Sequence, residues 1–351
     1  MKRNRRLFYD GFRIAMAYVG TVVGAGFATG QEILQFFTRY GYPSFWAILI
    51  SVILFIAVGR RIMFYAGKLG ARSYGIVADY IFGKAAPFVN LYLGLTFVLI
   101  CGAMFAGAGA LFQEQWGTPY LFGASVTALL TLLVTLFGVS GILTVNSIIV
   151  PCLIAFSLFV FVYVINRGYQ PVVYIQPLPG KIFTLFRTGI TYASFNLVLS
   201  IGVLAPMGGE IRDKGALTLG SFLGGGLLGL LLTMGNYTLL CSIPEVYYRE
   251  IPQMVTVSQM GSFFVSAYIL VIWAEIFTTA VGNLFAIHTI MEEKFKIASS
   301  LPTVAATVVG LILCLLGFSN IVSWFYPILG MIGFVLSAII LFQTFRDEKW
   351  S

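Results

Sequence analysis

The fold of this chain is decided by the stretch Gly20-Thr21-Val22-Val23-Gly24-Ala25-Gly26-Phe27-Ala28-Thr29-Gly30, which lies inside the first apolar segment. Each glycine costs about 1 kcal/mol relative to alanine inside a helix. A backbone group that is freed in hydrocarbon must find another partner or cost several kcal/mol more. A continuous regular helix is therefore disfavoured. We predict a helix that breaks near the middle of the membrane, where the freed groups bind an ion or a solute.

The composition points to a membrane protein with several spans. Of the 351 residues, 59% are hydrophobic and 10% are charged, which excludes a soluble globular protein. We count ten apolar runs that are long enough to cross about 30 Å of hydrocarbon. They lie near 12–38, 43–66, 86–112, 119–138, 142–165, 186–206, 216–242, 261–290, 301–318 and 321–344. We predict an all-α integral membrane protein of about ten transmembrane helices.

The distribution of the basic residues indicates how the chain is oriented in the membrane. The net charge is +8, but the basic residues are scattered over short segments between the spans, so we expect a lipid bilayer and no nucleic acid as partner. With the N-terminus inside, 16 of the 21 Lys and Arg residues lie on the cytoplasmic side, as the positive-inside rule requires. The other five are Arg39, Arg167, Lys181, Arg187 and Arg249. We expect a plasma-membrane protein with both termini in the cytoplasm. The alternative is a secretory signal peptide over residues 2–28, whose removal would reverse the charge bias.

Two halves of the chain begin alike. Residues 12–18, Phe-Arg-Ile-Ala-Met-Ala-Tyr, match residues 186–192, Phe-Arg-Thr-Gly-Ile-Thr-Tyr, and each half then reaches a Gly-acid-Ile element that contains Glu32 or Glu210. Because five spans separate the two starts, the halves enter the membrane from opposite sides. We predict one membrane domain, 1–351, with a 5+5 inverted repeat of about 11–166 and about 184–345. Spans 1 and 6 are then equivalent broken helices, with the second break within 194–202.

Span 8 carries a polar face. Glu275, Thr278 and Thr279 project from one side of the helix, and Asn283 continues that side by one turn. A carboxylate near the bilayer centre costs about 2.5 to 3.5 kcal/mol, so it is a candidate for function. Hard oxygen ligands suit a small cation such as Na⁺, and a carboxyl group equally suits a proton carrier. The alternative is structural: the threonines bond to their own helix and Glu275 pairs with a Lys or Arg at a span end.

Glu32 is the other buried acid of interest. By helical rise it lies about 9 Å beyond Gly26, toward the outside. We expect Glu32 to gate the site, to bind a solute amine or to cap a water-filled vestibule. The glycines of span 1 also have a structural alternative, because Gly20/Gly24 and Gly26/Gly30 are small-xxx-small pairs that permit close helix packing.

The sequence contains no Ser-His-Asp, Cys-His, HExxH or phosphate-loop arrangement. We therefore expect no enzyme and no cofactor other than a bound Na⁺.

The run from Gly20 to Glu32 resembles the first-span signature of the YkvI-type amino-acid permease family, which is related to the amino acid-polyamine-organocation superfamily. By length and ten-span layout the resemblance covers essentially the whole chain. More distantly, span 1 resembles the sodium symporters of the LeuT fold, in which a Gly-x-x-Val-Gly-x-Gly run unwinds. The family resemblance implies fold more securely than substrate.

The LeuT-like resemblance also implies ligands. A Na⁺ site would be formed by the carbonyls of Gly20 and Val23 and the hydroxyls of Thr278 and Thr279. In those symporters the position three residues before the first hydroxyl supplies only a backbone oxygen, but here it is Glu275. Whether Glu275 ligates Na⁺, replaces it with a proton or does neither stays open.

The same resemblance implies that the backbone around Ala25 and Gly26 receives a substrate carboxylate, while span 6 faces the solute. A second sodium site of neurotransmitter symporters uses an asparagine where this chain has Phe27, so we expect that site to be absent. The predicted substrate-binding residues are Gly24, Ala25, Gly26, Phe195, Asn196 and Ser200, and the coupling or gating residues are Glu32 and Glu275.

We therefore expect a Na⁺- or H⁺-coupled symporter of an amino acid or a similar small zwitterion, working by alternating access. The alternative is a non-transporting nutrient receptor subunit of the same fold, like those of spore germination. A channel is disfavoured because no repeated filter appears. The solute, the direction of transport and the oligomeric state are not determined by the sequence.

Overall fold

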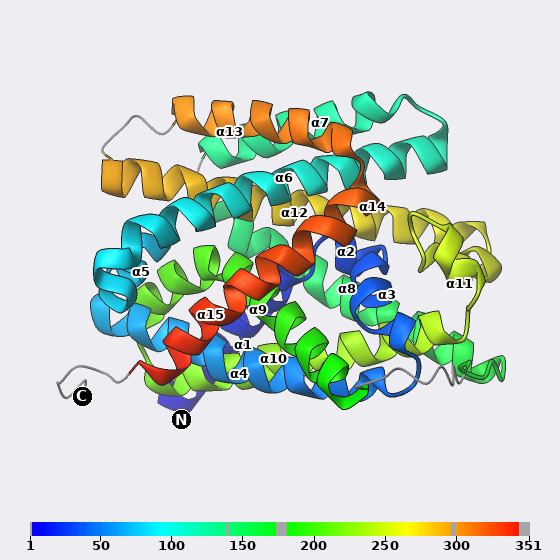
Figure 1. Cartoon of the computed structure of the whole chain (residues 1–351), viewed down its shortest axis with the longest axis horizontal. Helices are drawn as coiled ribbons and strands as arrows, with labels where there is room; N and C mark the ends of the chain where they lie inside the picture. Colours follow the sequence, from blue (N-terminus) through cyan, green and yellow to red (C-terminus); the bar gives the residue numbers. More distant parts are fainter. Residues whose placement is uncertain (1, 138–139, 173–180, 296–299, 344–351) are drawn as a thin grey trace.

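The computed structural model describes residues 2–137, 140–172, 181–295 and 300–343, and over these residues the chain is helical with no strand (Figure 1). The helices are α1 Lys2–Val22, α2 Ala25–Ala28, α3 Gln31–Phe36, α4 Ser44–Leu69, α5 Tyr74–Phe82, α6 Ala86–Trp116, α7 Tyr120–Phe137, α8 Ser140–Asn166, α9 Lys181–Ile211, α10 Lys214–Leu240, α11 Met254–Val257, α12 Ser262–Phe295, α13 Ser300–Leu313, α14 Phe318–Asn320 and α15 Tyr326–Phe342.

Seven helical segments of the described chain are long and apolar enough to span a membrane. They are Ser44–Leu69, Tyr74–Trp116, Ile149–Asn166, Ile182–Ile211, Lys214–Leu240, Ser262–Glu292 and Phe318–Phe342. Two shorter apolar helices cover Tyr120–Leu136 and Ser300–Leu316, and the predicted first span is divided among α1, α2 and α3. The number of ten crossings stays a prediction.

Three parts of the sequence predictions lie outside the described residues. These are the last two residues of the second repeat, 344–345, the final residues of the runs 119–138 and 321–344, and the basic residues Lys296, Arg346 and Lys349.

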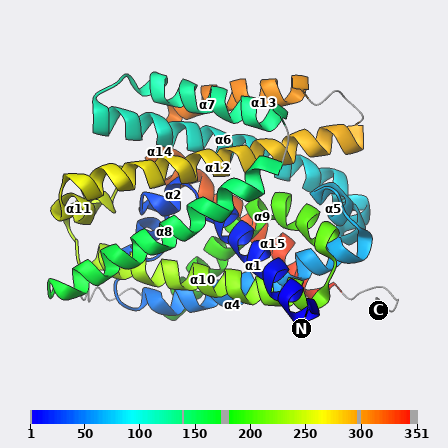
Figure 2. The same ribbon diagram turned by 180° about the vertical axis from the view of Figure 1, so that it is seen from behind.

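The helices form layers, with α9 at the centre (Figures 1 and 2). Helices α6 and α12 lie side by side, and α7 and α13 cover their outer side. On the opposite side α4 packs against α10, and α1, α2 and α9 occupy the space between these layers. In the most apolar window of α9, 83% of the residues are buried, against 22% for α8 and 28% for the segment that ends in α15. Helix α9 is therefore a core helix, whereas α8 and α15 present apolar surface to lipid.

Helix pairing is consistent with two equivalent halves. Helix α1 packs on α10, and α4 packs on α9. If α1 is the counterpart of α9 and α4 is the counterpart of α10, the symmetry of the two halves relates one of these contacts to the other. The bounds of the two repeats remain a prediction.

The predicted break in span 6 is wrong. Helix α9 continues from Lys181 to Ile211 with Pro206 inside it. Within 194–202 the residues are mostly good helix formers. Asn196 and Ser200 each donate a side-chain hydrogen bond of 3.1 Å to a carbonyl of their own helix. A proline removes one helical hydrogen bond, but the helix continues past Pro206 to Ile211.

Candidate functional site

The first span is broken, as predicted. Helix α1 ends at Val22, Gly24 is extended with φ −127° and ψ −164°, and α2 covers only four residues. Gly30 then has φ 86°, a left-handed conformation that glycine adopts without strain, and α3 begins after it. The break has two boundaries, and both are at glycines.

Backbone groups on both sides of the break lack helical partners. The last amide bond of α1 is from Val23 N to the Val19 carbonyl at 2.8 Å, and the first of α2 is from Ala28 N to the Gly24 carbonyl at 2.9 Å. Among the described residues, no backbone amide donates to the carbonyls of residues 20–22, and the amides of residues 25–27 donate to no backbone carbonyl. These groups are available to a ligand, because helix ends need partners.

Helix α12 contacts the start of this break through the hydroxyl of Thr279. Thr279 Oγ1 donates to the Val23 carbonyl at 3.0 Å, and the same side chain packs on Gly24, where an added Cβ would lie 3.2 Å from it. Thr278 Oγ1 donates instead to the carbonyl of Glu275 in its own helix at 3.3 Å. The structure thus brings together Val23, Gly24 and Thr279. Thr278 adopts the structural alternative, and no contact places it against Gly20.

Glu275 is fully buried beside this contact. Its exposed fraction is 0%, and neither carboxyl oxygen has a hydrogen-bond partner. Asn283 donates to the Thr279 carbonyl at 2.7 Å, which leaves its Oδ1 without a partner. The expectation that Glu275 pairs with a Lys or Arg is not met among the described residues. The face of α12 therefore carries unused oxygen acceptors within one turn of the break.

Glu32 does not lie where helical rise puts it. Its side chain folds back onto Gly26, so that a methyl group on Gly26 would overlap the Glu32 carboxylate and Cγ. The prediction of a 9 Å outward separation is wrong, because Gly30 interrupts the helix and turns the chain before α3. Glu32 is only 3% exposed, and its Oε2 has no hydrogen-bond partner.

Residues of α9 face Glu32. The side chains of Tyr192 and Asn196 adjoin the carboxyl group, and Tyr326 of α15 lies farther off but within electrostatic range. Phe195 stacks on Tyr326 with ring centroids 4.2 Å apart. Of the predicted substrate residues on α9, Asn196 therefore reaches the Glu32 cluster and Phe195 lies at its aromatic edge. Ser200 bonds within α9, with no recorded contact to the break.

The sequence prediction missed Tyr192, Tyr326 and Tyr268. Tyr192 precedes Asn196 by four residues, so helical spacing was a usable signal for it. Tyr326 lies on a different helix and has no such signal.

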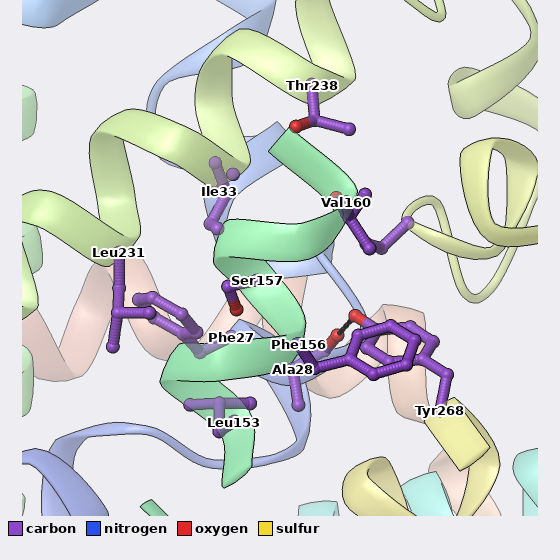
Figure 3. A pocket seen from close by; sticks show the side chains of 12 residues that line it. Phe27, Ala28, Ile33, Leu153, Phe156, Ser157, Val160, Leu231, Thr238 and Tyr268 are labelled. Carbon is purple, nitrogen blue, oxygen red and sulfur yellow. Dashed lines mark hydrogen bonds between the residues drawn. The ribbon is translucent and has the colours of Figure 1, made fainter. Parts of the chain in front are cut away.

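Tyr268 of α12 holds the far end of α2. Its hydroxyl donates to the Ala28 carbonyl, and Figure 3 shows the phenol reaching that oxygen. A cavity of about 20 Å³ lies beside this contact, bounded by Phe27 and Ala28 and by apolar side chains of α8 and α10. This volume holds about one water molecule. The cavity is therefore too small for an amino-acid solute.

A larger cavity lies between α3, α9 and α15. Its volume is about 190 Å³, and it is lined by Gln35, Phe36, Arg39, Tyr40, Arg187, Thr188, Thr191, Pro327 and Met331. The Phe36 ring contacts Tyr192 with centroids 5.3 Å apart, and Tyr192 in turn adjoins Glu32. Through these two rings the lining of the cavity contacts the residues around Glu32.

The segment after α10 closes over the broken span. The amide of Gln253 donates to the Thr29 carbonyl at 3.0 Å. Gln31 donates to the Arg249 carbonyl at 3.1 Å and to Ser319 Oγ at 3.2 Å, and Ser319 donates to Glu250. These bonds connect α3, this segment and α14. The segment after α10 therefore covers the broken span at its α3 end.

The oxygens at the break suit a hard cation better than a transition metal. Among the described residues no group of three His, Cys, Asp or Glu side chains gathers as metal ligands. The available donors are backbone carbonyls and hydroxyls, which are ligands for ions such as Na⁺.

Comparison with known proteins assigns the family. No protein-family model matches the chain. It is 30% identical over 332 residues to the uncharacterized membrane protein YkvI of Bacillus subtilis (strain 168), and the match covers 94% of each chain. This chain belongs to the YkvI family.

Solved structures confirm the LeuT-like fold of this YkvI-family protein. A structure of MhsT in complex with L-phenylalanine has a TM-score of 0.66 at 16% identity and covers 94% of this chain and 86% of that one. The outward-open, substrate-bound state of a Na⁺-coupled sialic acid symporter has a TM-score of 0.63 at 11% identity, with coverage of 95% and 79%. At such identities the likeness shows the fold alone.

Proposed function

We propose that the protein is a cation-coupled symporter of an amino acid or a similar small zwitterion. The observation that carries this proposal is the contact between the broken first span and α12, in which Thr279 Oγ1 bonds the Val23 carbonyl at 3.0 Å. The LeuT-like fold and its transporter neighbours support the same class of function. The chain would lie in the plasma membrane with both termini in the cytoplasm.

The proposed ion site uses the carbonyls of Gly20 and Val23 and the hydroxyls of Thr278 and Thr279. The unpaired carbonyls of residues 20–22 and the proximity of Thr279 support it. Thr278 must rotate its hydroxyl away from its own helix to join the ligands. An ion bound here ties the end of α1 to α12.

Coupling follows from this arrangement. An ion that fixes the end of α1 also fixes the start of α2, where Ala25 and Gly26 belong to the proposed solute site. Ion and solute then favour the same conformation, and each raises the affinity of the other by the same factor. If protons replace Na⁺, Glu275 is the carrier, because its carboxyl oxygens are buried without a partner.

The test is thermal stabilisation of the purified protein by amino acids in Na⁺ and in choline medium at two pH values. A ligand at 100 times its Kd raises stability by about 2.7 kcal/mol. We expect stabilisation by an amino acid that requires Na⁺, or that follows pH if Glu275 carries a proton. Replacing both Thr278 and Thr279 with alanine should abolish the Na⁺ requirement. Full retention of that requirement would contradict the ion site.

Uptake into liposomes then separates the two functional classes. A symporter accumulates the stabilising solute when an ion gradient is imposed. Stabilisation without uptake under either a Na⁺ or a proton gradient would refute transport and favour the nutrient receptor.

A further inference from the structure

The carboxyl group of Glu32 occupies the part of the broken helix that would receive an anionic solute. It packs so closely on Gly26 that a methyl group there would overlap it. Two carboxylates in one place repel each other and lose hydration together. A substrate carboxylate therefore cannot bind against Gly26 while Glu32 remains there.

The polar groups around Glu32 are buried, and several of their atoms lack a hydrogen-bond partner. Glu32 Oε2 and Asn196 Oδ1 are buried acceptors without a partner, and the Tyr192 hydroxyl is also unpaired. The orientation of the Asn196 amide follows from its contact with a carbonyl, because Nδ2 donates to the Tyr192 carbonyl at 3.1 Å and Oδ1 therefore points elsewhere. The three residues are 3%, 1% and 0% exposed. A ligand with several N–H donors would satisfy them.

No cation of the described chain supplies those donors. Tyr192 and Asn196 are the side chains that adjoin the Glu32 carboxyl group, and no Lys or Arg of the described residues joins them there. Arg39 and Arg187 line the 190 Å³ cavity, but both side chains are exposed. A carboxyl group buried in a membrane protein without a partner is costly and marks a binding function.

Aromatic rings complete the surroundings. Tyr192 lies against Phe36 and Phe37, with centroids 5.3 and 4.8 Å apart, and Tyr326 stacks on Phe195. Ring faces attract an alkylammonium group, most strongly where water is excluded.

We propose that Glu32 binds a positively charged amino group of the solute, with Asn196 and Tyr192 as further acceptors. This inference rests on the proposed function in taking the cargo to be a small amine-bearing solute. It makes the amino group the required feature and the carboxylate dispensable. The solute class is thus extended from amino acids to primary amines, and carboxylic acids without an amino group are excluded.

The experiment compares three matched compounds with the full-length protein in detergent. They are L-leucine, 3-methylbutylamine, which lacks the carboxylate, and 4-methylpentanoic acid, which lacks the amino group; the phenylalanine series provides a second set. Thermal stabilisation is titrated for the wild type, for Glu32→Gln and for Glu210→Gln. Glu210 is the matched control, because it occupies the corresponding Gly-acid-Ile element of the second half but is exposed.

We expect stabilisation of the wild type by the amine and the amino acid, and no response to the acid. A charge-assisted hydrogen bond contributes about 1.5 to 3 kcal/mol, so Glu32→Gln should weaken both responses at least about ten-fold. Glu210→Gln should leave them unchanged. If Glu32→Gln does not fold, the ranking of the three compounds on the wild type decides.

Several results would overturn the inference. They are stabilisation by the carboxylic acid in preference to the amine, an unchanged affinity of Glu32→Gln for the amine, or no stabilisation by any compound of either series. Uptake of an amino acid that is unaffected by Glu32→Gln would leave transport standing and remove the role of Glu32. Amine binding that depends on Glu32, without uptake under any ion gradient, would support the inference and refute transport.

Discussion

Two adjacent threonines of α12 should differ in what they contribute to stability. Thr279→Val removes the hydroxyl that bonds the Val23 carbonyl at 3.0 Å and leaves that carbonyl buried, since Val23 is 0% exposed. An unsatisfied buried acceptor costs about 1 to 3 kcal/mol. Thr278→Val removes only a 3.3 Å bond to a carbonyl of the same helix. Because such a bond competes with the helix's own ladder, we expect its loss to cost less than about 0.5 kcal/mol.

The expected shift in melting temperature follows from the size of the chain. At about 2.1 cal/mol/K per residue, 351 residues have an unfolding entropy of about 0.7 kcal/mol/K. Thr279→Val should therefore lower Tm by about 1.5 to 4 °C, and Thr278→Val by less than 1 °C. The assay is thermal unfolding in detergent, in choline medium so that no Na⁺ contributes.

A Na⁺ titration of the same variants then tests the proposed ion site. Both substitutions should remove the stabilisation by Na⁺, although only one lowers the Na⁺-free Tm. Equal Tm losses for the two variants in choline, or no loss for Thr279→Val, would refute the claim that the Thr279 hydroxyl, and not that of Thr278, joins α12 to the Val23 carbonyl.

Three further substitutions test other contacts. Gly26→Ala should displace the Glu32 carboxyl group, cost about 1 to 3 kcal/mol by overpacking and weaken solute binding. Its control is Gly94→Ala, at a position with no atom within 4 Å, which should be neutral or slightly stabilising. Unfolding and ligand titration measure both variants, and a neutral Gly26→Ala would contradict the contact between Gly26 and Glu32. Asn236→Ala should lower stability by about 1 to 3 kcal/mol, because it leaves two buried hydroxyl groups without the 2.9 and 3.0 Å bonds of its side chain; an unchanged Tm would show that those bonds contribute nothing. Tyr268→Phe leaves the Ala28 carbonyl, the last of α2, without its hydrogen bond. It should increase protease cleavage near the break more than it lowers the Tm of the whole protein. A lowered Tm without increased cleavage near the break would be evidence against a local role for Tyr268.

The break in span 1 was predictable because its cause is local. Glycine propensity acts at each residue separately, and the boundaries of the break fall at Gly24 and Gly30. The polar face of α12 was predictable for the same reason, since helical spacing alone places Glu275 and Thr279 on one side.

The continuity of α9 was not predictable from its glycines and proline. At its centre Asn196 and Ser200 bond to carbonyls of their own helix, and the surrounding helices exclude the water that would compete for the backbone. Sequence symmetry with span 1 suggested a second break, but equivalent positions in a repeat need not share a conformation when their side chains differ.

The sequence by itself determined that the chain is a helical membrane protein, that its first span is interrupted, and that buried acids accompany oxygen-bearing side chains. Only the tertiary structure decided that Glu32 returns onto Gly26 and that Thr279, not Thr278, meets Val23. The physical reason is that these contacts depend on the turn at Gly30 and on the rotation of α12 relative to α1. Val23 and Thr279 are 256 positions apart, and the packing of all the intervening helices sets that rotation, which no local pattern encodes.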